Sequence, residues 1–346
     1  MASSQERDIL RLTRDLLVPD DRTNWWHLAK AYATFGILAG SWWQLRLWGE
    51  GQSGWRSTVP WLLYPLVAIG IGSYVQARIS ALAHEASHFL LFRSRRLNDF
   101  VADVTCIFPL FGAIKRYREI HLAHHWHAND PERDPDLARV TKLFRLRYPL
   151  SRRDFYVGFL FRQLTPPLAI RYLLALSGQY SMKSGALAAE EAGGTPLWLR
   201  VGWYSTLAAV LSLTGLWEAF AWLWVAPFLA VFPVVLAVRE VFEHGQAPAA
   251  PEMLVSRRFE LGFPWQGIVF PTGLDNHQLH HMCPQIPHFR LEAAHQRVME
   301  HYPPYREQLL ICRGVDTPRG AGPSMLDVLG PRPGNTETAT RTEVAS

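Results

Sequence analysis

The chain has 346 residues, of which 49% are hydrophobic and only 19% are charged, against about 25% charged in typical soluble domains. This composition excludes a disordered, collagen-like or disulfide-rich protein. The net charge of +5 could indicate nucleic-acid binding. The basic residues flank apolar segments instead, which is typical of the positive-inside bias of membrane proteins. We therefore expect a membrane protein without a nucleic-acid partner. The three cysteines have no CxxC spacing, which disfavours a disulfide framework and fits a reducing compartment.

Residues 1–30 are predicted to form a cytoplasmic N-terminal segment. Four apolar stretches follow, each close to the 20 or so residues that cross a bilayer. Tryptophans gather at their ends, as in an interfacial aromatic belt. The predicted spans are residues 31–48, 59–83, 197–217 and 219–238. The last two are separated by a single residue, so we expect a tight helical hairpin.

The distribution of basic residues predicts the orientation of these spans. Residues 82–198 hold sixteen Lys and Arg, whereas the connection 49–58 holds only Arg56. The N-terminus, the long middle segment and everything after the fourth span should therefore face the cytoplasm. The predicted fold is an all-α, multi-pass membrane protein with about four transmembrane helices and a cytoplasmic helical cap. The catalytic domain is predicted at 31–313, and the Gly-, Pro- and Thr-rich residues 314–346 as a disordered tail.

Eight of the fourteen histidines recur at helical spacing. One set has the spacing i, i+4 and two sets have i, i+3, i+4, so that each set lies on one face of a helix. A further histidine follows the fourth span directly. The nine are His84 and His88; His121, His124 and His125; His244; and His277, His280 and His281.

The predicted topology places all nine on one side of the membrane, because two crossings separate the first set from the last. A single zinc ion needs three or four ligands, so nine imidazoles suit two metal ions with four to five nitrogens each. Imidazole serves Fe, Cu, Zn and Ni alike, and the residues alone do not choose among these metals. The sequence therefore predicts a histidine-rich dimetal site in the cytoplasmic cap.

Residues 84–88 also read as HExxH, the pattern of zinc metalloproteases in which the glutamate is the general base. An intramembrane zinc protease is therefore a remote alternative. It leaves both HxxHH sets without a role, and Glu85 points about 100° away from the histidine face of the helix. A non-catalytic, histidine-rich metal carrier is a further alternative.

The segments HEASH at 84–88, HLAHH at 121–125 and HQLHH at 277–281 resemble the three histidine boxes of the integral-membrane fatty acid desaturase and hydroxylase superfamily. The flanking residues at 96–99, 117–118, 134–136 and 282–287 are similar to the family as well. The resemblance covers about residues 30–305. It implies a di-iron centre whose ligands are the eight box histidines, with His244 as the extra ligand after the last span.

That resemblance implies an O2-dependent oxidoreductase that takes electrons from an external donor of the ferredoxin, cytochrome b5 or reductase type. Desaturation of a fatty acyl or lipid chain is the first expectation. A hydroxylase or ketolase acting on a lipid, terpenoid or small molecule is the alternative, because the boxes do not separate the two outcomes. No HPGG haem motif is present, so no fused cytochrome b5 domain is expected.

Several neighbouring residues are candidates for supporting roles. Glu240 stands where some family members place a water-bridged asparagine, so it could be a carboxylate neighbour of the metal, and His127 could assist. Arg93–Arg96, Arg116 and Arg118 could bind a phosphate headgroup or an acidic electron donor, although positive-inside topology explains them equally well. Carboxylates that could fix the metal-binding imidazoles are Asp99, Asp103, Asp130, Asp134, Asp136, Glu243 and Asp275.

Overall fold

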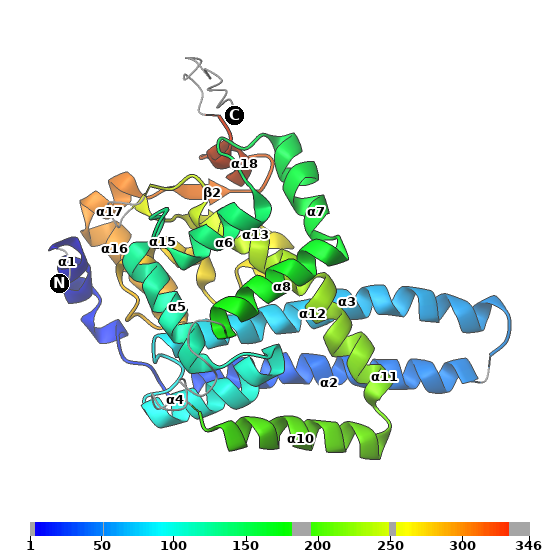
Figure 1. The fold of residues 1–346 in the computed structure, drawn as a ribbon. Coiled ribbons are helices and arrows are strands. Elements are labelled where there is room, and N and C mark those ends of the chain that lie inside the picture. Colours follow the sequence, from blue (N-terminus) through cyan, green and yellow to red (C-terminus); the bar gives the residue numbers. More distant parts are fainter. Residues whose placement is uncertain (1–3, 51, 182–194, 249–253, 332–346) are drawn as a thin grey trace, which may run out of the picture.

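Two long helices, α2 (Thr23–Glu50) and α3 (Trp55–Ser87), pack side by side and project from one side of the molecule (Figure 1). The structure is a computed structural model that describes residues 4–50, 52–181, 195–248 and 254–331. The other helices of the first half are α1 (Ser4–Leu12), α4 (Arg95–Ala102), α5 (Ile114–His127), α6 (Pro135–Phe144), α7 (Phe161–Gln163) and α8 (Pro166–Ser181). Those of the second half are α10 (Leu197–Thr214), α11 (Trp217–Phe220), α12 (Ala226–Ala230), α13 (Phe232–His244), α14 (Trp265–Val269), α15 (His277–Met282), α16 (His288–His301), α17 (Pro303–Gln308) and α18 (Met325–Leu329).

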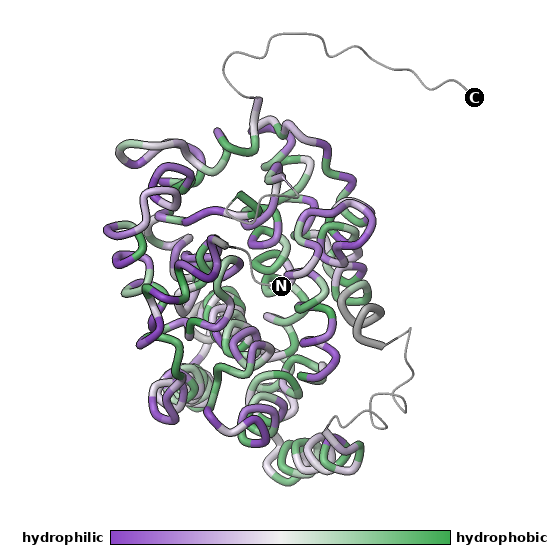
Figure 2. Tube along the Cα trace, turned by 90° about the vertical axis from the view of Figure 1, so that its left-hand side faces the viewer, coloured by the Kyte–Doolittle hydropathy of each residue, from purple (hydrophilic) through white to green (hydrophobic). Residues whose placement is uncertain are grey.

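Helices cover most of each of the four predicted spans. The spans differ, however, in whether they are long and apolar enough to cross a membrane. Among the described residues, Pro60–Ser87 and Trp217–His244 are each long and apolar enough to cross a membrane. A third candidate is the pair Arg95–Leu110 and Ile114–His127, which is bent by 88° at a short break. The first and third predicted spans fall on α2 and α10. Helix α10, at the bottom of Figure 2, is coloured mostly hydrophobic to neutral. Large apolar side chains are exposed on it, among them Leu213 at 88%.

The two strongest spans are locked together near the middle of α3. A Cβ atom on Gly72 would lie 2.5 Å from the Pro227 ring and 2.8 Å from the Leu223 carbonyl oxygen, so only glycine permits this approach. One turn further on, Gln76 Nε2 donates to the Trp224 carbonyl oxygen at 2.8 Å. That carbonyl lies in the π-helical turn Ala221–Val225, where the regular i→i−4 ladder is interrupted. The contact fixes the registry of α3 against the helix that ends at His244.

Local capping residues set where the shorter helices begin. Asp134 is the N-cap of α6 and accepts hydrogen bonds from two backbone N–H groups of its first turn, with Pro135 at the first helical position. Both residue types are favoured there because they satisfy or remove donors left over at a helix start. Helix α6 therefore starts directly after the second histidine set and packs against both α5 and α13.

The fold departs from the predicted all-α class in one small feature. Strands β1 (Arg258–Glu260) and β2 (Ile311–Arg313) pair in parallel, with Phe259 opposite Cys312. Both of these side chains are fully buried in the core that also includes α8 and α13. The fold is thus predominantly helical, with one short strand pair joining the cap to the C-terminal segment.

The prediction of a disordered tail from residue 314 is wrong for residues 314–331, which are described and folded. Ser324 and Asp327 form a capping box that starts α18, and Met325, Leu326 and Leu329 are almost fully buried in the same core as α13. Burial of these apolar side chains outweighs the flexibility of the preceding Gly- and Pro-rich stretch. Residues 332–346 of the predicted tail lie outside the described residues.

Replacing Leu329 by Ala should destabilise the protein by about 2–5 kcal/mol, because it leaves a cavity in a packed core. The matched control is Leu213→Ala on α10, where the side chain is 88% exposed and leaves no cavity. Thermal unfolding of the detergent-solubilised protein would measure both variants. Equal melting temperatures for the two would show that α18 contributes nothing to the core.

Candidate metal centre

Four helices bring the nine predicted histidines together at their ends. Helix α3 supplies His84 and has His88 as its C-cap. Helix α5 carries the second set over its last two turns, α13 ends at His244, and α15 begins with the third set. Ends of helices meet here because α3 packs against both α5 and α13. The convergence predicted from spacing and topology is therefore present in the structure.

The histidines form two separate groups in which all the candidate ligand atoms lie within 4.8 Å of one another. We call them the five-histidine group and the four-histidine group. The five-histidine group is His84, His88, His121, His125 and His280. The four-histidine group is His124, His244, His277 and His281. The second histidine set thus contributes to both groups: His121 and His125 belong to the five-histidine group, and His124 belongs to the four-histidine group.

The spacing of the ring nitrogens within each group matches ligands of a common ion. In the five-histidine group the contacting Nε2 atoms are 2.9–3.2 Å apart, as in the pairs His88–His121 and His280–His125. In the four-histidine group they are 3.1–3.2 Å apart. Two nitrogens bound about 2.1 Å from one ion lie about 3.0 Å apart at right angles and about 3.4 Å apart in a tetrahedron. The observed separations are compatible with ligands of a common ion in each group.

The hydrogen bonds of the outer ring nitrogens show which nitrogens are left to face a cation. His124 Nδ1 lies 2.9 Å from Asp134 Oδ1, and His244 Nδ1 lies 3.1 Å from the Val255 carbonyl oxygen. A carboxylate and a carbonyl only accept, so each Nδ1 carries the ring proton. The two Nε2 atoms then face each other at 3.2 Å. Although burial lowers it, the hydrogen bond to Asp134 raises the pKa of His124 to about 9 overall, so without an ion an Nε2–H of His124 can donate to His244. A metal ion between the two rings would take the place of that proton.

Other buried nitrogens support the same conclusion. His84 is 3% exposed, and neither of its ring nitrogens has a hydrogen-bond partner among the described residues. Burial, with the positive charge of Arg118, lowers the pKa of His88 to about 3. Burial and neighbouring imidazoles hold the pKa values of His277 and His281 well below the ordinary value. Neutral imidazole is the form that binds metal, and the donor set fits a pair of metal ions.

Two of the seven predicted supporting carboxylates contact a histidine of the groups directly. Asp134 holds His124, and Glu243 Oε1 lies 3.5 Å from His277 Nδ1. Asp136 is more distant, at 3.9 Å from His124 Nδ1. The others have different partners: Asp99 pairs with Arg118, Asp103 accepts from the Ile114 backbone, and Asp130 pairs with Arg133. No contact of Asp275 with the nine histidines is found among the described residues.

Arg118 has a structural role, not the suggested role in binding a headgroup. Its side chain is mostly buried, donates to the carbonyl oxygens of Ala86 and Ser87 at 2.9 Å each, and pairs with Asp99. It therefore adds hydrogen bonds to the last carbonyls of α3, as basic residues near a helix C-terminus do. This clamp fixes the backbone that carries His84 and His88.

The geometry around Glu85 contradicts the zinc-protease alternative. The Glu85 carboxylate is buried and accepts the backbone N–H of His288 at 3.0 Å. It is not among the residues that line the cavity beside the histidine groups. A general base must reach the water or substrate that it deprotonates, and Glu85 does not. His127, the other uncertain candidate, belongs to neither histidine group.

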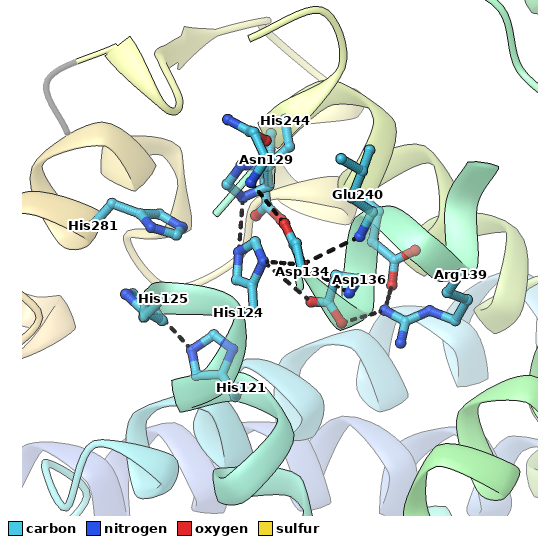
Figure 3. Close-up of polar contacts among 12 residues, drawn as sticks. His121, His124, His125, Asn129, Asp134, Asp136, Arg139, Glu240, His244 and His281 are labelled. Atoms are coloured by element: carbon cyan, nitrogen blue, oxygen red, sulfur yellow. Dashed lines mark hydrogen bonds and ion pairs between the residues drawn. The ribbon is translucent and has the colours of Figure 1, made fainter. Parts of the chain in front are cut away.

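Glu240 is a partner of Arg139, not a neighbour of the histidines. Its Oε1 accepts from Arg139 Nη2, while Arg139 also donates to Asp136 at 2.9 Å (Figure 3). The same Glu240 oxygen accepts from the Tyr172 hydroxyl at 2.8 Å. The sequence reasoning missed Arg139 and Tyr172. The only available signal was Arg139 at i+3 from Asp136 on a short predicted helix, a pattern that is usually solvated.

A cavity of about 350 Å³ lies directly beside the two groups. His84, His121, His124, His244 and His277 line one end of it. Charged side chains line the adjacent wall, and apolar side chains from α8, α12 and α13 line the remainder. A substrate in this cavity would contact histidines of both groups.

Comparison with known proteins identifies relatives of this chain. The sequence profile of the family described as fatty acid desaturase matches residues 58–309. That range includes all nine histidines, the cavity wall and both strong candidate spans. The chain is also 26% identical over 285 residues to the dihydrorhizobitoxine desaturase of Bradyrhizobium elkanii. This alignment covers 79% of the present chain and 78% of the relative.

Replacing Asp134 by Asn should lower the metal content of the four-histidine group. Loss of such an outer partner typically reduces metal affinity about 10–100-fold, and asparagine remains a good N-cap for α6. The matched control is Asp130→Asn, which changes a partly exposed carboxylate that is bound by the Arg133 side chain and by the backbone N–H groups of Glu132 and Arg133. Metal analysis after dialysis against a graded chelator would measure both. Equal metal retention by the two variants would contradict the role given to Asp134.

Proposed function

Because the chain belongs to the fatty acid desaturase family, we propose that it is a membrane-bound, O2-dependent oxidoreductase that holds two iron ions and desaturates a fatty acyl or lipid-like chain. The observation that carries this proposal is the pair of adjacent histidine groups. Five and four imidazoles, with their Nε2 atoms about 3 Å apart, provide two neighbouring sites of high nitrogen coordination. A zinc site would need only four ligands.

Two iron ions bound by these groups would supply O2 activation and hydrogen abstraction from an unactivated C–H bond. The overall reaction balances when the substrate loses two hydrogen atoms and one O2 takes up these together with two external electrons and two protons, giving two waters. The electrons come from a separate donor of the ferredoxin, cytochrome b5 or reductase type.

The residues of this chain hold and orient the reactants. Asp134 and the Val255 carbonyl keep the ring protons of His124 and His244 on Nδ1, which leaves Nε2 free to bind metal. The apolar wall, which includes Phe228 and Leu236, excludes water and places a methylene beside the histidines. Position matters because a shift of about 1 Å can cost about 10²-fold in rate.

The positions of the spans support the proposed topology. Helices α3 and α13 both reach the histidine groups with their C-terminal ends, so two parallel spans deliver these ends to one membrane surface. We place the N-terminus, the helical cap and the catalytic centre on the cytoplasmic side, with α2 and α10 as the other two spans. The basic residues between 82 and 198 favour this orientation.

Desaturation is favoured over hydroxylation by the relative whose name records a desaturase. We expect the purified protein, supplied with O2 and a reductant, to give a product that lacks two hydrogen atoms. Replacing His124 by Ala should abolish that product, because the four-histidine group loses one of its ligands. Mass spectrometry of extracts from cells expressing each form would test this. A product that gains one oxygen atom would identify a hydroxylase instead, and product that persists in His124→Ala would refute the assignment of ligands.

Metal analysis tests the dimetal proposal independently of activity. The wild-type protein, grown with iron, should contain about two irons per chain, because each histidine group forms one site. His88→Ala and His281→Ala should each lose metal from a different group, while the exposed His301, which lies in neither group, should be replaceable without loss. A preparation with one zinc per chain and no iron would refute the proposal.

A further inference from the structure

The charged wall of the cavity contains a buried guanidinium whose hydrogen bonds are not satisfied. Arg239 lies on α13, five residues before His244, and its side chain is only 13% exposed. Its Nε is buried without a hydrogen-bond partner and lies 3.6 Å from Glu243 Oε1. Among the described residues, neither terminal nitrogen of Arg239 donates a hydrogen bond, although arginine carries five N–H donors.

The second arginine of this wall is in a different situation. Arg139 is held between Asp136 and Glu240, and the same Glu240 oxygen accepts from Tyr172. Two carboxylates therefore balance the charge of Arg139 within the protein. Among the described residues, Arg239 has one carboxylate within 4 Å, Glu243, with Glu240 as a weaker electrostatic partner. The Glu243 oxygen is shared with His277 Nδ1 at 3.5 Å. The positive charge of Arg239 is thus the less compensated of the two.

A buried charge without hydrogen bonds is costly unless a partner satisfies it. Arginine presents its donors in a planar fork that matches a carboxylate, so two parallel charge-assisted bonds are available to one ligand group. The side chain lines the cavity, where such a group can reach it. The wall is therefore prepared to bind an organic anion.

The opposite part of the cavity suits an apolar chain. Phe111, Ile170, Leu174 and Leu229 line the cavity and are each more than 40% exposed on the outer surface. The cavity thus opens through apolar side chains onto the outer surface, and one of them, Leu229, lies on the fourth proposed span. A molecule with one anionic end and one apolar end fits when the anionic end lies inside.

We propose that Arg239 binds the carboxylate of the substrate inside this cavity, and that the carbon atoms oxidised lie close to that carboxylate. The inference rests on the proposed desaturase function and names its substrate class. We expect the oxidised carbon atoms near the carboxylate because one oxygen of Glu243 contacts both Arg239 and His277. A single side chain therefore separates the anion site from the four-histidine group. Both a fatty acid and an amino acid with an apolar side chain carry the required carboxylate.

Binding of small probes to the purified, iron-loaded full chain tests this assignment. Hexanoate and hexan-1-ol share a six-carbon chain and differ in the carboxylate, so hexanoate should bind wild-type protein more tightly. Arg239→Gln should weaken hexanoate binding roughly tenfold or more, the loss expected for a hydrogen bond to a charged group, and leave hexan-1-ol unaffected. Arg239→Lys should retain part of the affinity, because it keeps the charge and loses the fork.

The control is Arg306→Gln, an exposed arginine of α17 that does not line the cavity. Hexanoate binding that is equal in Arg239→Gln and Arg306→Gln would overturn the inference, since the carboxylate would then bind elsewhere, for example to iron. If Arg239→Gln does not fold, equal affinity of the wild-type protein for hexanoate and hexan-1-ol would overturn it as well. The position of the double bond in the product is a second readout. A double bond near the carboxylate supports the inference, and a double bond in the middle of a long acyl chain refutes it.

Norleucine distinguishes the two sources of the carboxylate. Tighter binding of norleucine than hexanoate supports an amino acid, and the reverse supports a fatty acid. If neither binds, the inference is wrong.

Failure of the proposed function is separately visible, because iron content and O2-dependent product are measured on the same wild-type preparation. A protein with two irons that forms product, and in which Arg239→Gln changes no carboxylate binding, would refute this inference alone.

Discussion

The site depends on the control of imidazole tautomers. An imidazole directs a lone pair at a metal only when its proton is held on the other ring nitrogen. Asp134 meets this requirement for His124, and the Val255 carbonyl meets it for His244. Asp134 is also the N-cap of α6, so the start of that helix and the protonation of a candidate ligand are fixed by one carboxylate. The loop that carries Val255 is in turn held by Ser256, which donates to the Glu243 carbonyl.

The packing of the membrane helices also positions the histidines. Helices α3 and α13 can deliver His84 and His244 to neighbouring sites only if their axial registry is fixed, and Gly72 and Gln76 fix it against Pro227 and Trp224. Arg118 then adds hydrogen bonds to the last carbonyls of α3. The interrupted, π-helical turn around Trp224 is therefore functional packing, because it supplies the carbonyl that Gln76 needs.

The parts of this site that obey local periodicity could be predicted from the sequence. The spacing of His121, His124 and His125 places them on one helical face whatever the tertiary fold, and the order of apolar segments brings the sets to one end of the molecule. Periodicity does not say which group each histidine joins, since neighbours such as His124 and His125 separate into different groups. Nor does it reveal that Glu240 turns to Arg139, because that pairing joins residues about a hundred positions apart.

The folded residues 314–331 were also not predicted. Their composition suggested disorder, but the Ser324–Asp327 capping box before an apolar run was a readable helix signal.

The wall of the cavity has an apolar part and a charged part. Apolar residues reach the outer surface, whereas Arg139, Arg239 and four carboxylates line the charged part of the wall. A purely hydrocarbon substrate would gain nothing from that charged wall and would have to desolvate it. The charges that also hold imidazoles in place, Asp134 and Glu243, are accounted for by the metal site. Asp136 and Glu240 are accounted for by Arg139. Arg239 is left as the charge that neither metal support nor internal pairing fully explains, so the substrate is the natural source of its partner.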